Sequence, residues 1–143
     1  MSDTAGAVLL VGRVLFAAYF AYYGYGHLRG SRGFVDRARA GGKLPVPFLA
    51  GWPAGVWLWA GALSIALGIW PDIGALMIAL FVSLTIVFVH DFWNLDEEGG
   101  REAQRQLFLR NSAFVAANVA LFGTFVGLGD RLPFALVPPL LSL

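Results

Sequence analysis

The side chains of this sequence that could do chemistry stand at the ends of long apolar runs. His27 closes the first run, His90 and Asp91 close the third, and Arg110 and Asn111 open the fourth. If the runs are antiparallel helices, these ends meet at one face, and their polar groups predict a small pocket for a lipid headgroup or a quinone ring. The alternative interpretation is a set of independent interhelical hydrogen bonds and interfacial charges, each worth about 0.6 kcal/mol.

Arg13 belongs to the same candidate set, although it lies inside the first apolar run rather than at its loop end. It stands about six residues into that run, roughly 9 Å from the start of a helix. It either snorkels to the outer headgroups or faces the other helices, where it could hold a carboxylate, a lipid phosphate or a quinone carbonyl. Asn111 and Asn118 are seven residues apart, so they share a helix face and need partners within a bundle.

Several kinds of chemistry lack their residues in this sequence. The chain has no cysteine, which excludes disulfides, thiolate metal sites and thiol nucleophiles. Its two histidines raise the question of a metal or haem, but two histidines at the ends of neighbouring runs do not require the opposed arrangement of haem ligands, and we predict no metal site. No phosphate-binding loop, nucleophile elbow, HExxH motif or dinucleotide fingerprint is present, so we do not expect a complete enzyme and assign no catalytic residue.

The elements that must position these residues are four long apolar helices. The chain is 58% hydrophobic and 13% charged, whereas soluble domains average about 45–50% apolar and about 25% charged residues. The apolar runs cover residues 7–28, 50–70, 73–89 and 107–128, each near the roughly 20 residues that cross a bilayer as a helix. We therefore predict an all-α membrane protein in which residues 1–143 form one bundle of four transmembrane helices.

The connections and small residues refine this prediction. Only Pro71 and Asp72 separate the second run from the third, which predicts a tight antiparallel hairpin. Between the first two helices we expect a short amphipathic interfacial segment. The C-terminal stretch from residue 130 holds three prolines and is too short for a fifth span, so we expect it to lie in the interface. Two glycine pairs spaced four residues apart predict close helix packing: Gly51 with Gly55, and Gly123 with Gly127.

The charges predict an orientation but no nucleic-acid partner. The net charge is only +1, which gives no sign of nucleic-acid binding. Seven basic residues lie in the first and third connections, and a single one lies opposite: Arg29, Arg32, Arg37, Arg39, Lys43, Arg101 and Arg105 against Arg131. Because Lys and Arg are retained on the cytoplasmic side, we expect both long loops in the cytoplasm and both termini outside, in a prokaryotic plasma membrane.

Six motifs are spread along nearly the whole chain. They are an early arginine in "LLVGRVLFAAYF", the glycine-rich "YGYGHL", the "LPVPFLAGW" stretch, the "ALSIALGIWPDIGALMIALF" hairpin, the "VHDFW" exit and "QLFLRNSAF". Together they resemble the DoxX family of small four-helix membrane proteins. The last two motifs are the most specific. The sequence departs from the family at His27, where the family usually has lysine, and in the second helix, which lacks the acidic residue often found there.

The resemblance implies an integral membrane protein linked to redox assemblies, since the family takes its name from a subunit of a thiosulfate-oxidising, quinone-reducing enzyme. Three roles stay open: an anchor or accessory subunit of a membrane oxidoreductase complex, a quinone- or lipid-binding subunit that takes part in electron transfer, and a small-molecule carrier. The expected partners are the lipid bilayer and either other subunits or a second copy of the chain. Quinone is the one candidate cofactor.

Overall fold

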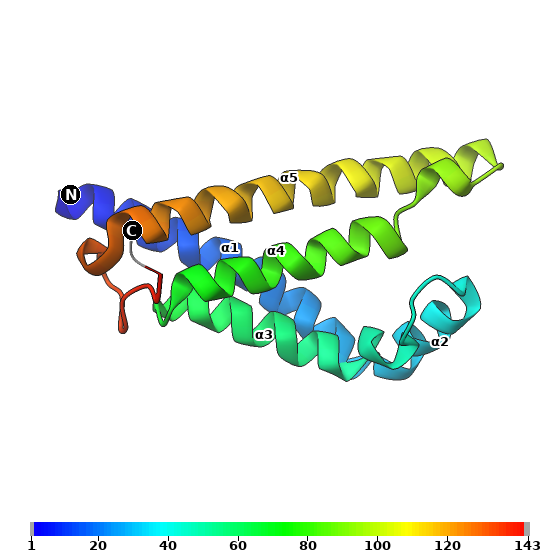
Figure 1. Ribbon diagram of the computed structural model, residues 1–143, viewed down its shortest axis with the longest axis horizontal. Coiled ribbons are helices and arrows are strands. Elements are labelled where there is room, and N and C mark those ends of the chain that lie inside the picture. Colours follow the sequence, from blue (N-terminus) through cyan, green and yellow to red (C-terminus); the bar gives the residue numbers. More distant parts are fainter. Residues whose placement is uncertain (1, 142–143) are drawn as a thin grey trace.

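The computed structural model describes residues 2–141, and its long helices lie side by side in one elongated bundle (Figure 1). The four long helices are α1 (Asp3–Arg29), α3 (Trp52–Leu67), α4 (Pro71–Phe88) and α5 (Glu98–Leu128). A shorter helix, α2 (Ser31–Gly41), follows α1, and three single turns complete the described part: η1 (Pro47–Ala50), η2 (Phe92–Asn94) and η3 (Gly129–Arg131). This architecture confirms the predicted all-α membrane bundle.

The helix lengths fit a bilayer unevenly. Helices α1, α4 and α5 are long and apolar enough to cross a membrane, whereas α3 is apolar but has only 16 residues, or about 24 Å. Helix α5 starts nine residues before its predicted start and has 31 residues, about 46 Å against about 30 Å of hydrocarbon. Its first turns are polar and continue the helix because Glu102 contacts Arg105 and Gln106 one turn away.

The α3–α4 hairpin is as tight as predicted. Helix α3 ends at Gly68, whose left-handed backbone (φ 64°) an L residue adopts only with strain. Trp70 is also left-handed (φ 47°), and α4 begins at Pro71, where the missing N–H costs no helical hydrogen bond. The Ser64 hydroxyl donates to the Ile69 and Trp70 carbonyls, which fixes the turn.

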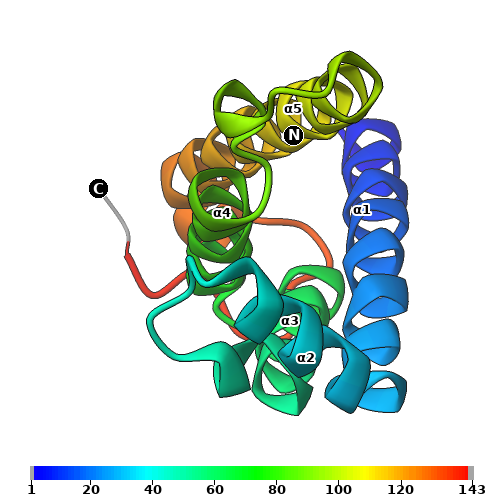
Figure 2. The ribbon, with the colours of Figure 1, turned by 90° about the vertical axis from the view of Figure 1, so that its right-hand side faces the viewer.

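Seen along the bundle, α1, α3, α4 and α5 follow one another around the interior (Figure 2). Glycines bring the first three together. A Cβ on Gly55 of α3 would lie 2.8 Å from the Gly24 carbonyl oxygen of α1, and one on Gly74 of α4 would lie 2.8 Å from the Gly61 carbonyl oxygen of α3. Backbones can approach this closely only because no side chain intervenes, which confirms packing at Gly55.

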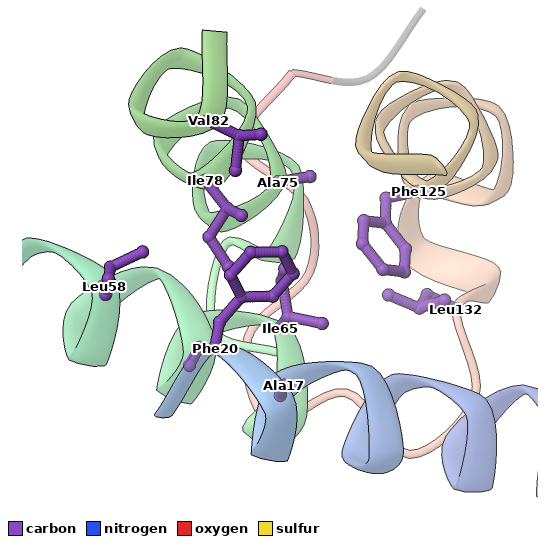
Figure 3. Close-up of a cluster of buried hydrophobic side chains, with 10 residues drawn as sticks. Ala17, Phe20, Leu58, Ile65, Ala75, Ile78, Val82, Phe125 and Leu132 are labelled. Atoms are coloured by element: carbon purple, nitrogen blue, oxygen red, sulfur yellow. The ribbon is translucent and has the colours of Figure 1, made fainter. Parts of the chain in front are cut away.

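Helix α5 meets α1 through large side chains instead. The rings of Tyr19 and Phe114 lie 4.7 Å apart between centroids, and Phe20 also contacts Phe114. Deeper in the bundle, Phe125 of α5 and Leu132 point toward the core residues of α1, α3 and α4 (Figure 3).

The second predicted glycine pair does not pack within the chain. A Cβ on Gly123 or Gly127 would meet no described atom within 4 Å, and both residues are exposed. The spacing predicted a contact either with a helix of this chain or with a partner. The first is absent among the described residues, because the buried face of α5 carries Asn118 and Phe125, and the contact with a partner stays a prediction.

The segment that follows η3, residues 132–141, is called the tail here. It turns back across the end of the α3–α4 hairpin, at the bundle end where α1 begins (Figure 1). The Leu136 N–H donates to the Leu67 carbonyl at 3.2 Å, and the Val137 N–H donates to the Gly68 carbonyl at 2.9 Å. The tail thus pairs with the hairpin turn like a short strand.

Candidate functional site

At the loop end of the bundle, His27 joins α1 to the start of α3. Its Nδ1–H donates to the Ala50 carbonyl at 2.7 Å, and its ring stacks on Phe34 of α2 at 4.0 Å between centroids. The edge of a third ring, Phe81 of α4, completes the contact. His27 therefore holds three helices and η1 together through one hydrogen bond and two ring contacts.

His90 and Asp91 form a second network between α4 and α5. The His90 Nδ1–H donates to the Gln104 side-chain oxygen at 2.8 Å, and both His90 and Asp91 are buried. Asp91 accepts hydrogen bonds from Lys43 and from the Asn94 amide. Asp91 therefore joins the segment after α2 to the turn η2.

Arg110 and Asn111 stand next to each other on α5 but differ in surroundings. Asn111 is buried, whereas Arg110 is exposed. Arg110 is one turn from Phe114 on the same helix face. No hydrogen bond or ion pair among the described residues joins Arg110 to His27 or His90.

The loop end thus contains two separate networks, with His27 in one and His90 in the other. Lys43, which follows α2, forms an ion pair with Asp91 of the second network. The predicted pocket of His27, His90, Arg110 and Asn111 stays a prediction. Among residues 2–141, no group of three or more His, Asp or Glu side chains is placed to hold a metal ion.

Arg13 lies toward the opposite end of the bundle and is fully buried, so it does not snorkel to the headgroups. Its Nη2 donates to the Phe134 carbonyl at 2.9 Å and to the Ala66 carbonyl at 3.4 Å, and its Nη1 donates to the Pro133 carbonyl at 3.4 Å. These partners lie in α3 and the tail, so the guanidinium connects α1 to both. The interpretation in which Arg13 faces the bundle is the correct one.

Asp72 is the functional candidate that the sequence analysis missed. It is also fully buried, in the first turn of α4, and it accepts the backbone N–H groups of Leu140 at 3.0 Å and Leu141 at 2.8 Å. A carboxylate in that turn is favoured by the helix dipole. The signal in the sequence was a lone acid inside an apolar hairpin, together with a tail too broken by proline to form a helix.

Arg13 and Asp72 therefore form one clamp on the tail. The arginine binds two tail carbonyls and the aspartate binds two tail N–H groups, so both charged side chains recognise backbone atoms. A Cβ on Gly68 would lie 2.7 Å from the Ala135 Cα, which shows how closely the tail is pressed on the hairpin turn.

Comparison with known proteins adds the family. The DoxX family model matches residues 8–91, more than half of the chain, from the first turns of α1 to the residue after His90. Curated proteins and solved structures give no match. The matched part contains Arg13 and Asp72, while α5 and the tail lie beyond it. Its apolar helices and this match together identify the chain as an integral membrane protein that belongs to the DoxX family.

Proposed function

We propose that this protein is a membrane anchor or accessory subunit of an oxidoreductase complex. The observation that carries the proposal is the use of its buried and partly buried polar side chains: Arg13, Asp72, His90 and the partly buried His27 each bind groups of their own chain. Polar side chains that are already hydrogen-bonded within the chain suit a scaffold that positions a catalytic partner. The link to redox chemistry comes from the family resemblance alone.

The outer face of α5 is where we place the partner. Ala113, Ala116, Ala120, Gly123 and Gly127 are exposed on this helix, and in lipid such small residues let a second helix approach closely. Because α5 is about 46 Å long and the hydrocarbon is about 30 Å thick, the polar first turns of α5 extend beyond the hydrocarbon. The proposed occupant is a transmembrane helix of the catalytic subunit or of another anchor subunit.

Affinity purification from native membranes in mild detergent, followed by mass spectrometry of proteins and lipids, tests this role. We expect oxidoreductase subunits to co-purify with the wild-type chain. The Gly127→Leu variant should co-purify smaller amounts of them. The matched control is Gly12→Leu, because Gly12 of α1 is also an exposed glycine with open space around it. Recovery of the chain with lipid alone, or equal losses in both variants, would contradict the proposal.

A quinone- or lipid-binding role is the second candidate, supported by Arg110. An exposed cation one turn from the Tyr19–Phe114 contact combines a charged group with aromatic faces between α1 and α5. Arg110→Gln should lower the amount of quinone extracted with the purified protein. Arg105→Gln is the control, since Arg105 lies on the polar extension and pairs with Glu102. An unchanged quinone content in Arg110→Gln would remove this candidate.

The orientation of the bundle is part of the proposal. The basic residues of α2 and of the start of α5 support cytoplasmic long loops, with the start of α1 outside. Because the chain has no cysteine, single cysteines at Ser2 and Ser31 can be labelled without background. We expect a membrane-impermeant reagent added outside to label the cysteine at position 2 alone, and labelling of position 31 instead would reverse the orientation.

A further inference from the structure

Arg13 is a buried cation without an anionic partner. Its side chain is fully buried, and no carboxylate oxygen within residues 2–141 lies within the 4 Å of an ion pair. Its three acceptors are neutral carbonyls, two of them at 3.4 Å. Its Nε has no hydrogen-bond partner in the described part of the chain. The guanidinium therefore has unused donor capacity and no compensating charge.

Asp72 does not fill this role, although it is buried at the same end of the bundle. Both of its carboxylate oxygens accept tail N–H groups. A guanidinium presents its donors in a planar fork that matches phosphate or carboxylate oxygens, and it binds them more strongly than neutral carbonyls. The tail carbonyls of Pro133 and Phe134 are thus weaker substitutes for an anion at Arg13.

The tail is attached in a way that permits its replacement. It is bound largely through backbone atoms, while the side chains of Phe134, Leu136 and Leu140 are 58%, 70% and 59% exposed. Phe134 also has a left-handed backbone (φ 54°), which is unfavourable for a bulky L residue. Leu132 of the tail stays buried in the core, so a change in attachment concerns the stretch after it, whose Phe134 and Leu136 side chains already face outward.

The place of Arg13 suits a phospholipid. Its guanidinium lies level with the α3–α4 turn, because it binds the Ala66 carbonyl and a Cβ on Gly68 would lie 3.2 Å from its Nη1. The same hairpin carries an apolar groove of about 390 Å³ that could take part of an acyl chain. The groove is lined by Ala60, Leu63, Ser64, Leu67, Ile69, Trp70, Ile73 and Met77.

We propose that Arg13 is the centre of a phosphate-binding site for an anionic phospholipid headgroup, and that the tail is its resident competitor. The phosphate replaces the carbonyls of Pro133 and Phe134 on the guanidinium and so loosens residues 133–137 from the hairpin, while Asp72 keeps the N–H groups of Leu140 and Leu141. The inference needs no protein partner, so it is independent of the proposed redox role.

The first measurement follows the tail. A nitroxide on Leu136→Cys, whose side chain is exposed and which lies two residues after Phe134, reports the mobility of this stretch in nanodiscs. We compare phosphatidylcholine alone, phosphatidylcholine with phosphatidic acid, and phosphatidylcholine with inorganic phosphate in the buffer. We expect phosphatidic acid to raise the mobile fraction several-fold. Release by inorganic phosphate as well would extend the site to the free anion.

The second measurement follows the lipid by native mass spectrometry. Val137→Pro removes the N–H that binds Gly68 and loosens the tail, whereas Leu136→Ala keeps every backbone donor and trims an exposed side chain. We expect Val137→Pro to retain several-fold more phosphatidic acid than Leu136→Ala does, and we expect Arg13→Gln to abolish the gain. If Arg13→Gln does not fold, the comparison of Val137→Pro with Leu136→Ala still tests the proposal, because both variants keep Arg13.

The proposal is overturned if the mobile fraction is the same in all three conditions. It is also overturned if Val137→Pro and Leu136→Ala retain equal amounts of phosphatidic acid, or if the gain persists in Arg13→Gln, since the lipid would then bind elsewhere.

Discussion

The two ends of the bundle handle buried polar groups in different ways. At the loop end, His27 and His90 each make one hydrogen bond to a group on a neighbouring element, and Lys43 reaches Asp91 from a partly exposed position. At the other end, Arg13 and Asp72 are fully buried and bind backbone atoms of the tail, which is 68 to 121 residues away in sequence.

This difference shows where the fold depends most on polar contacts. A charged group that loses its partners inside a membrane protein is left without water, whereas a group near the surface can be hydrated. The loop end therefore tolerates change better than the tail clamp. The following predictions test that ranking from the largest expected effect to the smallest.

Removal of the Asp72 carboxylate should have the largest effect. Asp72→Ala loses two hydrogen bonds to a charged group, each worth about 1.5–3 kcal/mol, so we expect the free energy of unfolding to fall by about 3 kcal/mol or more. Reversible unfolding in mixed micelles measures this change. Asp3→Ala is the control, because Asp3 also lies in the first turn of a helix but is exposed. Equal losses would remove the distinction between the tail clamp and an ordinary helix end.

Two glycines with the same backbone conformation compare the two ends directly. Gly68 and Gly42 both have φ 64°, but a Cβ on Gly68 would lie 2.7 Å from the Ala135 Cα, while one on Gly42 would meet nothing within 4 Å. Alanine in this conformation costs roughly 1 kcal/mol at either site, and overpacking adds about 1–3 kcal/mol at Gly68. We expect a larger fall in the thermal midpoint for Gly68→Ala than for Gly42→Ala. Similar falls would mean that the tail moves away from the added methyl group at little cost.

A double-mutant cycle sharpens the description of the loop end. His90→Ala and Gln104→Ala should be coupled by about 0.5–1.5 kcal/mol, because they remove the two partners of one hydrogen bond. His90→Ala with Arg110→Gln should be additive within about 0.5 kcal/mol. Coupling of that size or more between His90 and Arg110 would instead support the shared pocket predicted from the sequence.

The smallest effect should come from Lys43→Met, since the Lys43 side chain is 42% exposed and such pairs contribute about 1 kcal/mol or less. The ion pair requires the ionised Asp91 carboxylate, which acid protonates. The stability difference between wild type and Lys43→Met should therefore shrink on acidification, and a constant difference would assign it to the apolar stem of Lys43.

The parts of the structure that could be predicted are those that leave a pattern of residue types along the sequence. Apolar runs and the short Pro71–Asp72 connection predicted the helices and the hairpin, and the depth of Arg13 marked it as a candidate. The tail clamp could not be predicted, because Arg13 and Asp72 bind backbone atoms, and a backbone carbonyl or N–H leaves no residue-type signal at positions 133 or 140. The shared face of Asn111 and Asn118 predicted the buried side of α5, whereas the spacing of Gly123 and Gly127 alone left open whether they contact this chain or a partner.

The distance in sequence between Arg13 and the tail sets an order of events during synthesis. The Pro133 carbonyl that Arg13 binds is made 120 residues after it, which at about 5–20 residues per second is a delay on the order of ten seconds. Helix α1 must therefore enter the bilayer with its cation unpaired, at a cost of about 2.5–3.5 kcal/mol on insertion scales, offset by the apolar residues on either side. Helix α1 therefore completes its hydrogen bonding only when the tail has been made.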